Sequence, residues 1–468
     1  MFPLELTAES LEEALRLTTR FVRDEVDSLA EQPSADVLGA EDLARTFIEA
    51  LPEGPHALPE ILDRLRPAIR KSFNTAGPGY LAFIPGGGIM AAAIADFIAV
   101  SANRYVGVRP PAPALAQIEE TAIAWLGRIM GYPEAAGGIL TSGGSLSTLS
   151  AIVAARETHL PDDFSKGIIY LSNETHYCVP KAARVAGFRD AQIRRVGVDS
   201  RRRMDVEALA RMVEADRALG LHPFLIIANV GTTNTGAIDD IPGILAVGRR
   251  HSMWVHADAA YGGFFRLASG GAQLMPRIED CDSITLDPHK GMFLPYGTGC
   301  LLVRDPAALK RAHSMDAEYL HDVRAQTSAN FSDLSPELSR DFRGLRIWLP
   351  LVLHGAGAFR DAIEEKLTLT RWAYDQLKDD ARFELIDEPQ LSVIAFRLRG
   401  DDADADARNE ELMARVNARG RVFLSSTRLD GRYVIRLCVL SFRTHLDRVR
   451  DAVEAIQSEA GMLGAPLS

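Results

Sequence analysis

The side chains best suited to chemistry are a lysine and an aspartate that each follow a short apolar run. Lys290 lies in the segment 287–291 (Asp-Pro-His-Lys-Gly), directly after the run 283–286, and Asp258 follows the run 255–257. A lysine amine condenses with the aldehyde of pyridoxal phosphate, and a carboxylate keeps the pyridine nitrogen of that cofactor protonated, so that the ring withdraws electrons. The pair therefore predicts a pyridoxal-phosphate site. The alternative interpretation is a surface lysine and a solvated aspartate with no common role.

Three further segments with polar or glycine-rich sequences also follow strand-like runs. The segment 141–145 (Thr-Ser-Gly-Gly-Ser) opens a helical stretch, and a helix N-terminus binds phosphate through its free N–H groups. His176 has a ring that stacks on a planar cofactor or exchanges a proton, and the segment 231–236 offers threonine hydroxyls. Taken alone, the first segment is equally a plain helix cap, and the histidine is a capping or core residue.

The elements that position these residues alternate between strands and helices. Strand-like runs at 138–140, 167–171, 221–230, 253–257, 283–286 and 300–303 are separated by amphipathic helical stretches. Strands separated by helices predict βαβ units and a mainly parallel sheet, and ligands bind such sheets beyond the carboxyl ends of the strands. The segments that carry Lys290, Asp258, His176 and the residues 141–145 and 231–236 are therefore expected to meet in one cleft.

The two ends of the chain depart from this pattern. Residues 9–72 show helical periodicity, and from about residue 360 helices at 361–379 and 408–419 alternate with strand-like runs at 383–386, 391–398, 422–425 and 433–439. We expect three domains: an N-terminal helical arm (1–86), a large pyridoxal-phosphate-binding α/β domain (87–350) and a small C-terminal α+β domain (351–468).

The composition argues against several classes of protein. The 468 residues are 47% hydrophobic and carry a net charge of −11, so neither a membrane span nor a nucleic-acid partner is expected. The four cysteines are widely separated, which argues against a disulfide framework and a metal site. The first residues lack the basic and apolar regions of a signal peptide, and a cytoplasmic location is the resulting expectation.

In this order along the chain, the motifs resemble the group II pyridoxal-phosphate decarboxylases, above all the aromatic-L-amino-acid decarboxylase branch. The resemblance covers nearly the full length and includes the segments 79–85, 103–114 and 339–348. It implies an α/β fold of type I, the aspartate-aminotransferase-like fold of pyridoxal-phosphate-dependent transferases, with a large mainly parallel sheet and a small α+β C-terminal domain. It also implies a homodimer whose active sites take residues from both chains.

The resemblance further implies a role for each matching residue. Lys290 would carry the cofactor, Asp258 would pair with the pyridine nitrogen, and His176 and Ala260 would lie against the two faces of the ring. The other residues implied at the cofactor are Gly144, Ser145 and His289 at the phosphate, with Asp287 beside them, and Thr233 at the cofactor or the substrate.

The expected substrate pocket departs from that of aromatic-specific relatives. Phe83, Ile84, Val106 and Val108 stand at the positions that line the side-chain site there, and they are apolar but not heavily aromatic. Arg109 follows directly. It either binds an acidic substrate side chain or forms an ion pair outside the pocket, and we favour the ion pair.

Two further departures concern charge and proton transfer. Many relatives have asparagine where this chain has Asp287, which brings a carboxylate near the cofactor phosphate. A loop at about 317–338 carries a proton-donating tyrosine in the family, and counting back from Arg340 places Phe331 at that position. Tyr319 is the only tyrosine nearby.

The sequence thus predicts an enzyme, a carboxy-lyase that uses pyridoxal phosphate to convert a small L-amino acid, in the first place an aromatic one, to an amine and carbon dioxide. Three alternatives stay open. An aromatic aldehyde synthase is suggested by Phe331, and a decarboxylase of an acidic amino acid is suggested by Arg109. A non-catalytic cofactor-binding scaffold is the third, and the intact Lys290, Asp258 and His176 argue against it.

Overall fold

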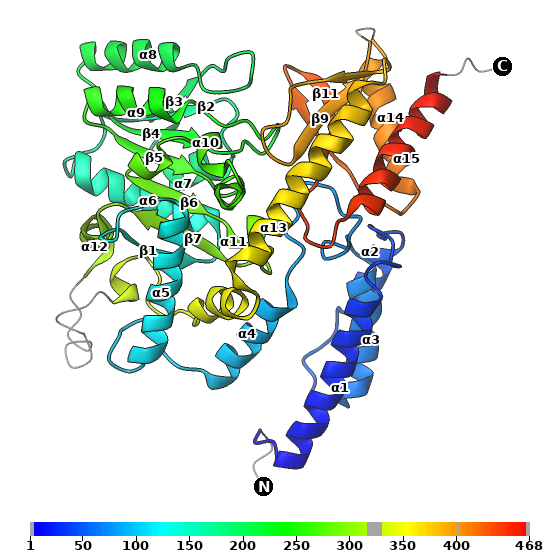
Figure 1. The fold of residues 1–468 in the computed structure, drawn as a ribbon. Coiled ribbons are helices and arrows are strands. Elements are labelled where there is room, and N and C mark those ends of the chain that lie inside the picture. Colours follow the sequence, from blue (N-terminus) through cyan, green and yellow to red (C-terminus); the bar gives the residue numbers. More distant parts are fainter. Residues whose placement is uncertain (1–3, 316–329, 401–402, 465–468) are drawn as a thin grey trace. The chain divides into compact units, whose positions relative to one another are not determined.

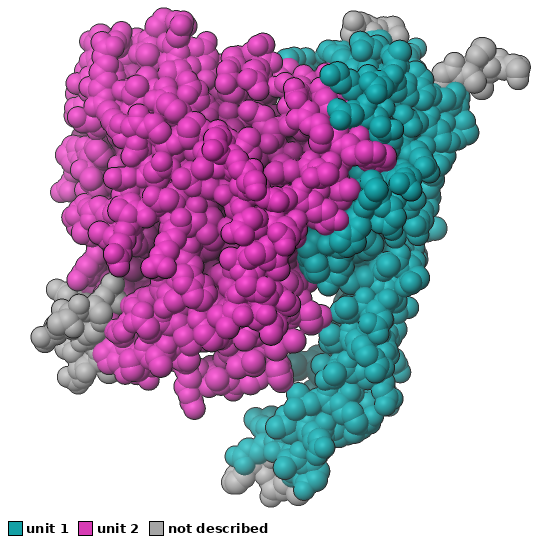
Figure 2. All heavy atoms as spheres, in the orientation of Figure 1, with its two compact units in different colours: residues 1–85, 375–384, 396–468 teal, residues 86–374, 385–395 magenta. Residues whose placement is uncertain are grey.

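The computed structural model describes residues 4–315, 330–400 and 403–464, whose fold is shown in Figure 1. The chain divides into two compact units (Figure 2). The smaller comprises Met1–Pro85, Asp375–Glu384 and Phe396–Ser468, and the larger comprises Gly86–Tyr374 and Leu385–Ala395. The division into three domains at residues 86 and 350 stays a prediction.

The larger unit is built around a seven-stranded sheet with the strand order β1-β7-β6-β5-β4-β2-β3. Its strands are β1 (Gly137–Thr141), β2 (Gly167–Ser172), β3 (Ile193–Val196), β4 (His222–Asn229), β5 (Trp254–Asp258), β6 (Ser283–Leu286) and β7 (Gly299–Val303). Among these strands only β7 is antiparallel to its neighbours, and the pairs from β6 to β3 are all parallel. The expectation of a large, mainly parallel sheet is confirmed.

Continuous burial explains why the sequence identifies most of these strands. Every residue of β6 is buried, as is every residue of β4 after His222, as expected for a parallel sheet that is covered on both faces. The strand that sequence reasoning missed is β3, with the sequence Ile-Arg-Arg-Val. It pairs with β2 alone at the edge of the sheet, so its central arginines remain partly accessible and interrupt the apolar pattern.

The central helix of the larger unit is α6 (Gly144–His159), which packs across β4, β5, β6 and β7. Small buried residues, among them Ser147, Ala151 and Ala154, allow this helix to approach the sheet closely. The other helices of this unit are α4 (Met90–Ala102), α5 (Pro113–Ile129), α7 (Cys178–Val185), α8 (Val206–Ala218), α9 (Ile241–Arg250), α10 (Gly271–Leu274), α11 (Pro288–Gly291), α12 (Pro306–His313) and most of α13 (Gly344–Lys378). Short 3₁₀ turns are η1 (Asp190–Gln192), η2 (Gly263–Leu267), η3 (Ile278–Asp280) and η5 (Phe331–Asp333).

A second sheet has the order β10-β11-β9-β8, formed by β8 (Phe383–Leu385), β9 (Val393–Leu398), β10 (Ser425–Leu429) and β11 (Arg432–Cys438). The hairpin β10–β11 is antiparallel and turns at Asp430 and Gly431, whose φ angles are 50° and 81°. Positive φ at both positions is typical of a type I′ turn. The helices of the smaller unit are α1 (Ala8–Asp27), α2 (Ala40–Arg45), α3 (Leu58–Arg70), α14 (Ala405–Ala418) and α15 (Leu446–Gly464).

The expected strand at 422–425 is wrong, because the strand of the sheet begins only at Ser425. The apolar residues before it pair with a different segment. The backbone N–H of Phe423 donates to the Gly79 carbonyl at 2.9 Å, and the Leu81 N–H donates to the Phe423 carbonyl at 3.0 Å. The apolar run therefore reflects burial beside residues 79–81 and not membership of the sheet.

Ion pairs link helices α1 and α3 of the N-terminal arm. Glu25, which is almost buried, pairs with Arg66 and with Arg70, whose Nε lies 3.0 Å from the carboxylate. Large apolar side chains on the two helices nevertheless remain exposed: Leu11, Leu15, Val22, Ile61, Leu65 and Ile69. Exposed apolar surface of this extent is typical of interaction sites.

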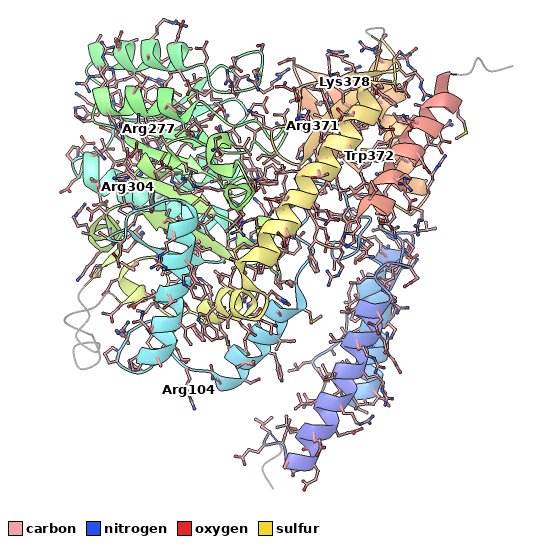
Figure 3. The ribbon with its side chains drawn as sticks, in the orientation of Figure 1. Arg104, Arg277, Arg304, Arg371, Trp372 and Lys378 are labelled. Atoms are coloured by element: carbon pink, nitrogen blue, oxygen red, sulfur yellow. The ribbon has the colours of Figure 1, made fainter. Side chains whose placement is uncertain are left out.

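Three arginines of the larger unit that Figure 3 labels form ion pairs with carboxylates. Arg277 and Arg304 both contact Asp280, at 2.6 and 3.6 Å, and Arg371 contacts Glu388 at 2.5 Å. Such exposed pairs contribute little to stability, but they neutralise the guanidinium charges locally. In the described part of the chain, none of the helices is both long and apolar enough to cross a membrane.

Candidate active site

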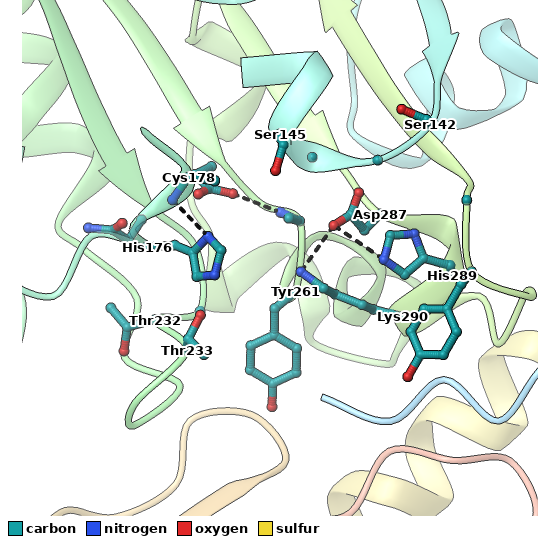
Figure 4. A pocket seen from close by; sticks show the side chains of 18 residues that line it. Ser142, Ser145, His176, Cys178, Thr232, Thr233, Tyr261, Asp287, His289 and Lys290 are labelled. Carbon is teal, nitrogen blue, oxygen red and sulfur yellow. Dashed lines mark hydrogen bonds and ion pairs between the residues drawn. The ribbon is translucent and has the colours of Figure 1, made fainter. Parts of the chain in front are cut away.

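A cavity of about 430 Å³ opens at the carboxyl ends of the strands of the larger unit (Figure 4). Asn229 and Asp258 are the last residues of β4 and β5, and Asp287 follows β6. Nine residues that the sequence assigned to the cofactor all line this cavity: Gly144, Ser145, His176, Thr233, Asp258, Ala260, Asp287, His289 and Lys290. The parallel sheet thus brings segments that are far apart in the sequence to one site.

Lys290 extends from the short helix α11, and its amine points toward Asp287 (Figure 4), with Nζ 3.0 Å from Oδ2. Burial alone would lower the pKa of Lys290, but the carboxylates of Asp287 and Asp258 outweigh this effect and raise the pKa. The glycine that follows the lysine is required by packing, because a Cβ at Gly291 would lie 2.7 Å from that of Phe264. The lysine is therefore held as an ammonium ion at a fixed position.

Asp258 and His176 face the same cavity. Oδ1 of Asp258 accepts a hydrogen bond from the Ala260 N–H at 3.3 Å. Burial raises the pKa of Asp258, and the nearby Lys290 ammonium opposes that rise. His176 Nδ1 accepts from the Cys178 N–H at 3.3 Å, so a neutral ring carries its proton on Nε2. Burial lowers the pKa of His176, which favours this neutral form.

The segment 141–145 forms the turn between β1 and α6. Thr141 Oγ1 lies 2.8 Å from Ser147 Oγ, and Gly143 has a φ of 152°. Gly299 of β7 approaches so closely that a Cβ there would lie 2.5 Å from the Gly143 Cα. The first N–H groups of α6 have no partner within the helix, and they therefore offer an anion site beside the Ser145 hydroxyl.

These residues fit pyridoxal phosphate. The cavity offers a lysine amine for the aldehyde, a buried carboxylate for the pyridine nitrogen, a neutral imidazole for the ring and a helix N-terminus for the phosphate. The Nδ1 of His289 lies 2.6 Å from the Thr298 carbonyl and must donate there. This leaves Nε2 toward the cavity, where it donates to a phosphate when the ring carries both protons.

Sequence reasoning missed four side chains that line the cavity: Cys178, Asn229, Tyr261 and Tyr296. Asn229 links two site loops, since its Nδ2 donates to Ser172 Oγ at 3.0 Å and to Asp239 Oδ2 at 2.9 Å. Its position as a polar residue ending an apolar run was the available signal. Burial raises the pKa of Cys178 to about 12, so this thiol stays protonated at neutral pH.

Three of the residues expected around the substrate lie in the larger unit, but they do not line its cavity. Val106 and Val108 are fully buried, and Val106 packs with residues of α4 and α13 such as Ala95 and Leu345. Arg109 places Nη1 2.7 Å from Glu120 Oε1 and donates from Nη2 to Gln117 Oε1 at 2.8 Å. Its guanidinium is thus engaged by α5, which supports the ion-pair interpretation.

Phe83 and Ile84 belong to the smaller unit. Phe83 is 53% exposed and has a φ of 53°, an uncommon conformation for a residue with a side chain. Its N–H donates to Ser425 Oγ at 3.1 Å, and its carbonyl accepts from Arg436 Nη2 at 3.4 Å. A strained backbone conformation that neighbouring hydrogen bonds maintain is typical of residues that bind ligands.

Phe331 is buried in η5, and its ring lies 5.1 Å from the Arg340 guanidinium carbon. Arg340 is itself fully buried. It places Nη1 2.6 Å from Glu119 Oε1 and donates from Nη2 to the Leu140 carbonyl, at the end of β1, at 2.9 Å. Phe331 does not line the cavity of its own chain, and its role above the cofactor stays a prediction. Tyr319 lies outside the described residues.

Comparison with known proteins agrees with this geometry. The model of the pyridoxal-dependent decarboxylase conserved domain matches residues 41–399. An aromatic-L-amino-acid decarboxylase of Bacillus atrophaeus is 33% identical over 464 residues, which are 98% of this chain and 97% of that protein. A phenylacetaldehyde synthase of Arabidopsis thaliana is 26% identical, covering 98% and 97% of the two chains. The crystal structure of Oryza sativa TDC with PLP and tryptamine matches with a TM-score of 0.94 and 26% identity, covering 99% of this chain and all of that one.

Proposed function

Because the chain belongs to the pyridoxal-dependent decarboxylase family, and is thus a pyridoxal-phosphate-dependent carboxy-lyase acting on an amino acid, we propose that it converts an aromatic L-amino acid to the amine and carbon dioxide. The observation that carries the proposal is the cavity itself. It gathers Lys290, Asp258 and His176 around one space beside the N-terminus of α6.

Each of these side chains has a role toward the cofactor. Bound pyridoxal phosphate supplies an electron-withdrawing ring that stabilises the electron pair left when carbon dioxide departs. Lys290 provides the amine that bonds to the cofactor, and Asp258 keeps a proton on the pyridine nitrogen. His176 lies against the ring and, as a neutral imidazole, is able to accept or return a proton on Nε2. Gly144, Ser145 and His289 would hold the phosphate, Ala260 would pack on the ring, and Thr233 would contact the cofactor or the substrate.

The aromatic substrate class is supported by the relatives and by the apolar residues expected around the side chain. The Bacillus atrophaeus relative is an aromatic-L-amino-acid decarboxylase, and the Oryza sativa structure contains tryptamine. Phe83 and Ile84 would bind a flat apolar side chain without leaving a buried charge unpaired. Val106 and Val108 are fully buried in their own chain, and direct contact with the substrate is not proposed for them.

Arg109 provides a test of the substrate class. Because its guanidinium already pairs with Glu120, Arg109→Gln should leave the ranking of substrates unchanged and alter kcat/KM by less than about threefold, as for a partly exposed ion pair. The measurement is competition among phenylalanine, tyrosine, tryptophan, aspartate and glutamate. Wild-type preference for an acidic amino acid, lost in the variant, would refute both the ion-pair interpretation and the aromatic proposal.

A second candidate function, an aromatic aldehyde synthase, is favoured by Phe331. A phenyl ring shields the reacting carbon but has no proton to give, so slow protonation would expose that carbon to dioxygen. The products would then be the aldehyde, ammonia, carbon dioxide and hydrogen peroxide. The Arabidopsis thaliana relative is a phenylacetaldehyde synthase.

Phe331→Tyr should therefore shift products from aldehyde toward amine, because the added hydroxyl is a proton donor. The ratio of amine to aldehyde under air, with oxygen consumption recorded, measures the shift. Arg340 contacts this ring, so thermal unfolding of the variant serves as the control for a purely structural effect. An unchanged ratio in a variant of normal stability would remove Phe331 from the reaction.

A homodimer with shared active sites completes the proposal. The exposed apolar faces of α1 and α3 are suited to burial against a second copy of the chain. A cytoplasmic location stays a prediction from the sequence.

A further inference from the structure

Asp287 occupies an unusual electrostatic position in the cavity. Only 3% of the residue is exposed, and Oδ2 lies 3.0 Å from Lys290 Nζ and 3.7 Å from His289 Nε2. Its other oxygen, Oδ1, is buried and makes no hydrogen bond within the described part of the chain. A buried carboxylate oxygen without a donor is costly, so this oxygen is available to a group that enters the cavity.

The carboxylate lies directly against the turn that opens α6. A Cβ built at Gly144 would stand 3.0 Å from Asp287 Oδ2 and 3.3 Å from Oδ1. Any larger residue at position 144 would press its Cβ against the carboxylate, so glycine leaves the most room at this distance. A phosphate bound by the first N–H groups of α6 would therefore lie close to the Asp287 carboxylate.

Few positive charges are available to separate these two anions. The described residues that line the cavity include one lysine and no arginine, and burial lowers the pKa of His176, which favours its neutral form. His289 Nε2 lies 3.7 Å from Asp287, and this ring adds a positive charge only when both of its nitrogens carry a proton. The titratable groups that face or electrostatically influence Asp287 are Lys290 and His289 of α11, Asp258 of β5, His176 after β2, Cys178 of α7 and Cys300 of β7.

We propose that Asp287 makes cofactor binding proton-linked: the carboxyl group and the cofactor phosphate share one proton, which is taken from solvent as the cofactor binds. A phosphate monoester carries a charge of about −2 at neutral pH. With one proton added, the carboxylate and phosphate together carry about −2 instead of about −3. Two anionic oxygens in close contact inside a protein commonly retain a proton in this way.

The proposal predicts how affinity depends on pH. Above the second pKa of the phosphate, about 6, the phosphate enters as a dianion, so binding takes up a proton and weakens about tenfold for each pH unit. Below that pKa the phosphate already carries the proton, and the dependence disappears. Asp287→Asn keeps the shape of the side chain but removes the second anion, so its affinity should stay nearly constant between pH 7 and 9.

The test is calorimetric titration of the full-length apoprotein at pH 8 in two buffers with different ionisation enthalpies. Pyridoxamine 5′-phosphate is the probe, because it has the phosphate but no aldehyde to react with Lys290, and pyridoxamine is the probe without phosphate. Asp190→Asn is the matched control, since it removes one carboxylate of the same unit at an exposed site, paired with Arg184.

Wild type and Asp190→Asn should each take up about one proton per pyridoxamine 5′-phosphate, and Asp287→Asn should take up about none. Equal proton uptake by wild type and Asp287→Asn, or equal uptake with both probes, overturns the proposal. The inference rests on the cofactor site proposed above and not on the substrate. Failure of wild type to bind pyridoxal phosphate at Lys290 would instead overturn the site assignment itself.

Discussion

Lys290→Arg should abolish covalent attachment of the cofactor and lower turnover by on the order of a thousandfold or more, as for removal of other covalent catalysts. The substitution keeps a cation near Asp287, which lies 3.0 Å from Lys290 Nζ, but an arginine does not condense with the aldehyde. Borohydride reduction of wild type followed by peptide mapping should give a pyridoxyl group on Lys290, and the variant should give none.

The control for this experiment is another lysine of the same unit. Lys310 lies in the last turn of α12, away from the lining of the cavity, and Lys310→Arg should retain the adduct and the wild-type rate. An adduct on a lysine other than Lys290 in wild type would show that the cavity at the ends of β4, β5 and β6 is not the cofactor site.

Asp258→Asn should lower turnover by at least about a hundredfold, or about 2.7 kcal/mol of transition-state stabilisation. An amide at this position no longer attracts a proton to the pyridine nitrogen, and an unprotonated ring is a poor acceptor of electrons. Cofactor affinity should fall less than turnover, because the phosphate site at α6 and Lys290 remain. The rate under single-turnover conditions, compared with the dissociation constant of pyridoxal phosphate, separates the two effects.

Asp258→Glu is the companion variant, since it keeps the charge but moves it by one methylene group. It should retain more activity than Asp258→Asn if charge at this position is what the reaction needs. A rate of Asp258→Asn close to that of wild type would contradict the assigned role.

The sequence revealed the site because chemically specific side chains follow continuous apolar runs. Asp258 ends β5 and Lys290 lies in the short helix that follows β6, and a parallel sheet places such strand ends together. The residues that pack around these side chains could not be recognised from the sequence. Tyr261 lines the cavity and its hydroxyl lies 2.8 Å from Ser392 Oγ, a contact between residues far apart in the sequence.

The elements that sequence reasoning missed or misplaced are those set by tertiary contacts. The edge strand β3 carries two arginines and lacks an apolar pattern, and residues 422–424 are apolar because they pair with the segment 79–81 rather than with a sheet. The environment of Phe331 also depends on a long-range contact, because the Arg340 guanidinium over its ring pairs with Glu119. Local sequence does not encode such contacts, since they depend on which segments meet after folding.

The most direct test of the whole account is a balance of products. Holoenzyme is incubated under air with L-phenylalanine, L-tyrosine or L-tryptophan while carbon dioxide, amine, aldehyde, oxygen and hydrogen peroxide are all quantified. The account predicts one carbon dioxide released per aromatic amino acid consumed, matched by the sum of amine and aldehyde, with peroxide formed only in step with aldehyde. Consumption of the aromatic amino acids without release of carbon dioxide, or release from aspartate or glutamate alone, would contradict it.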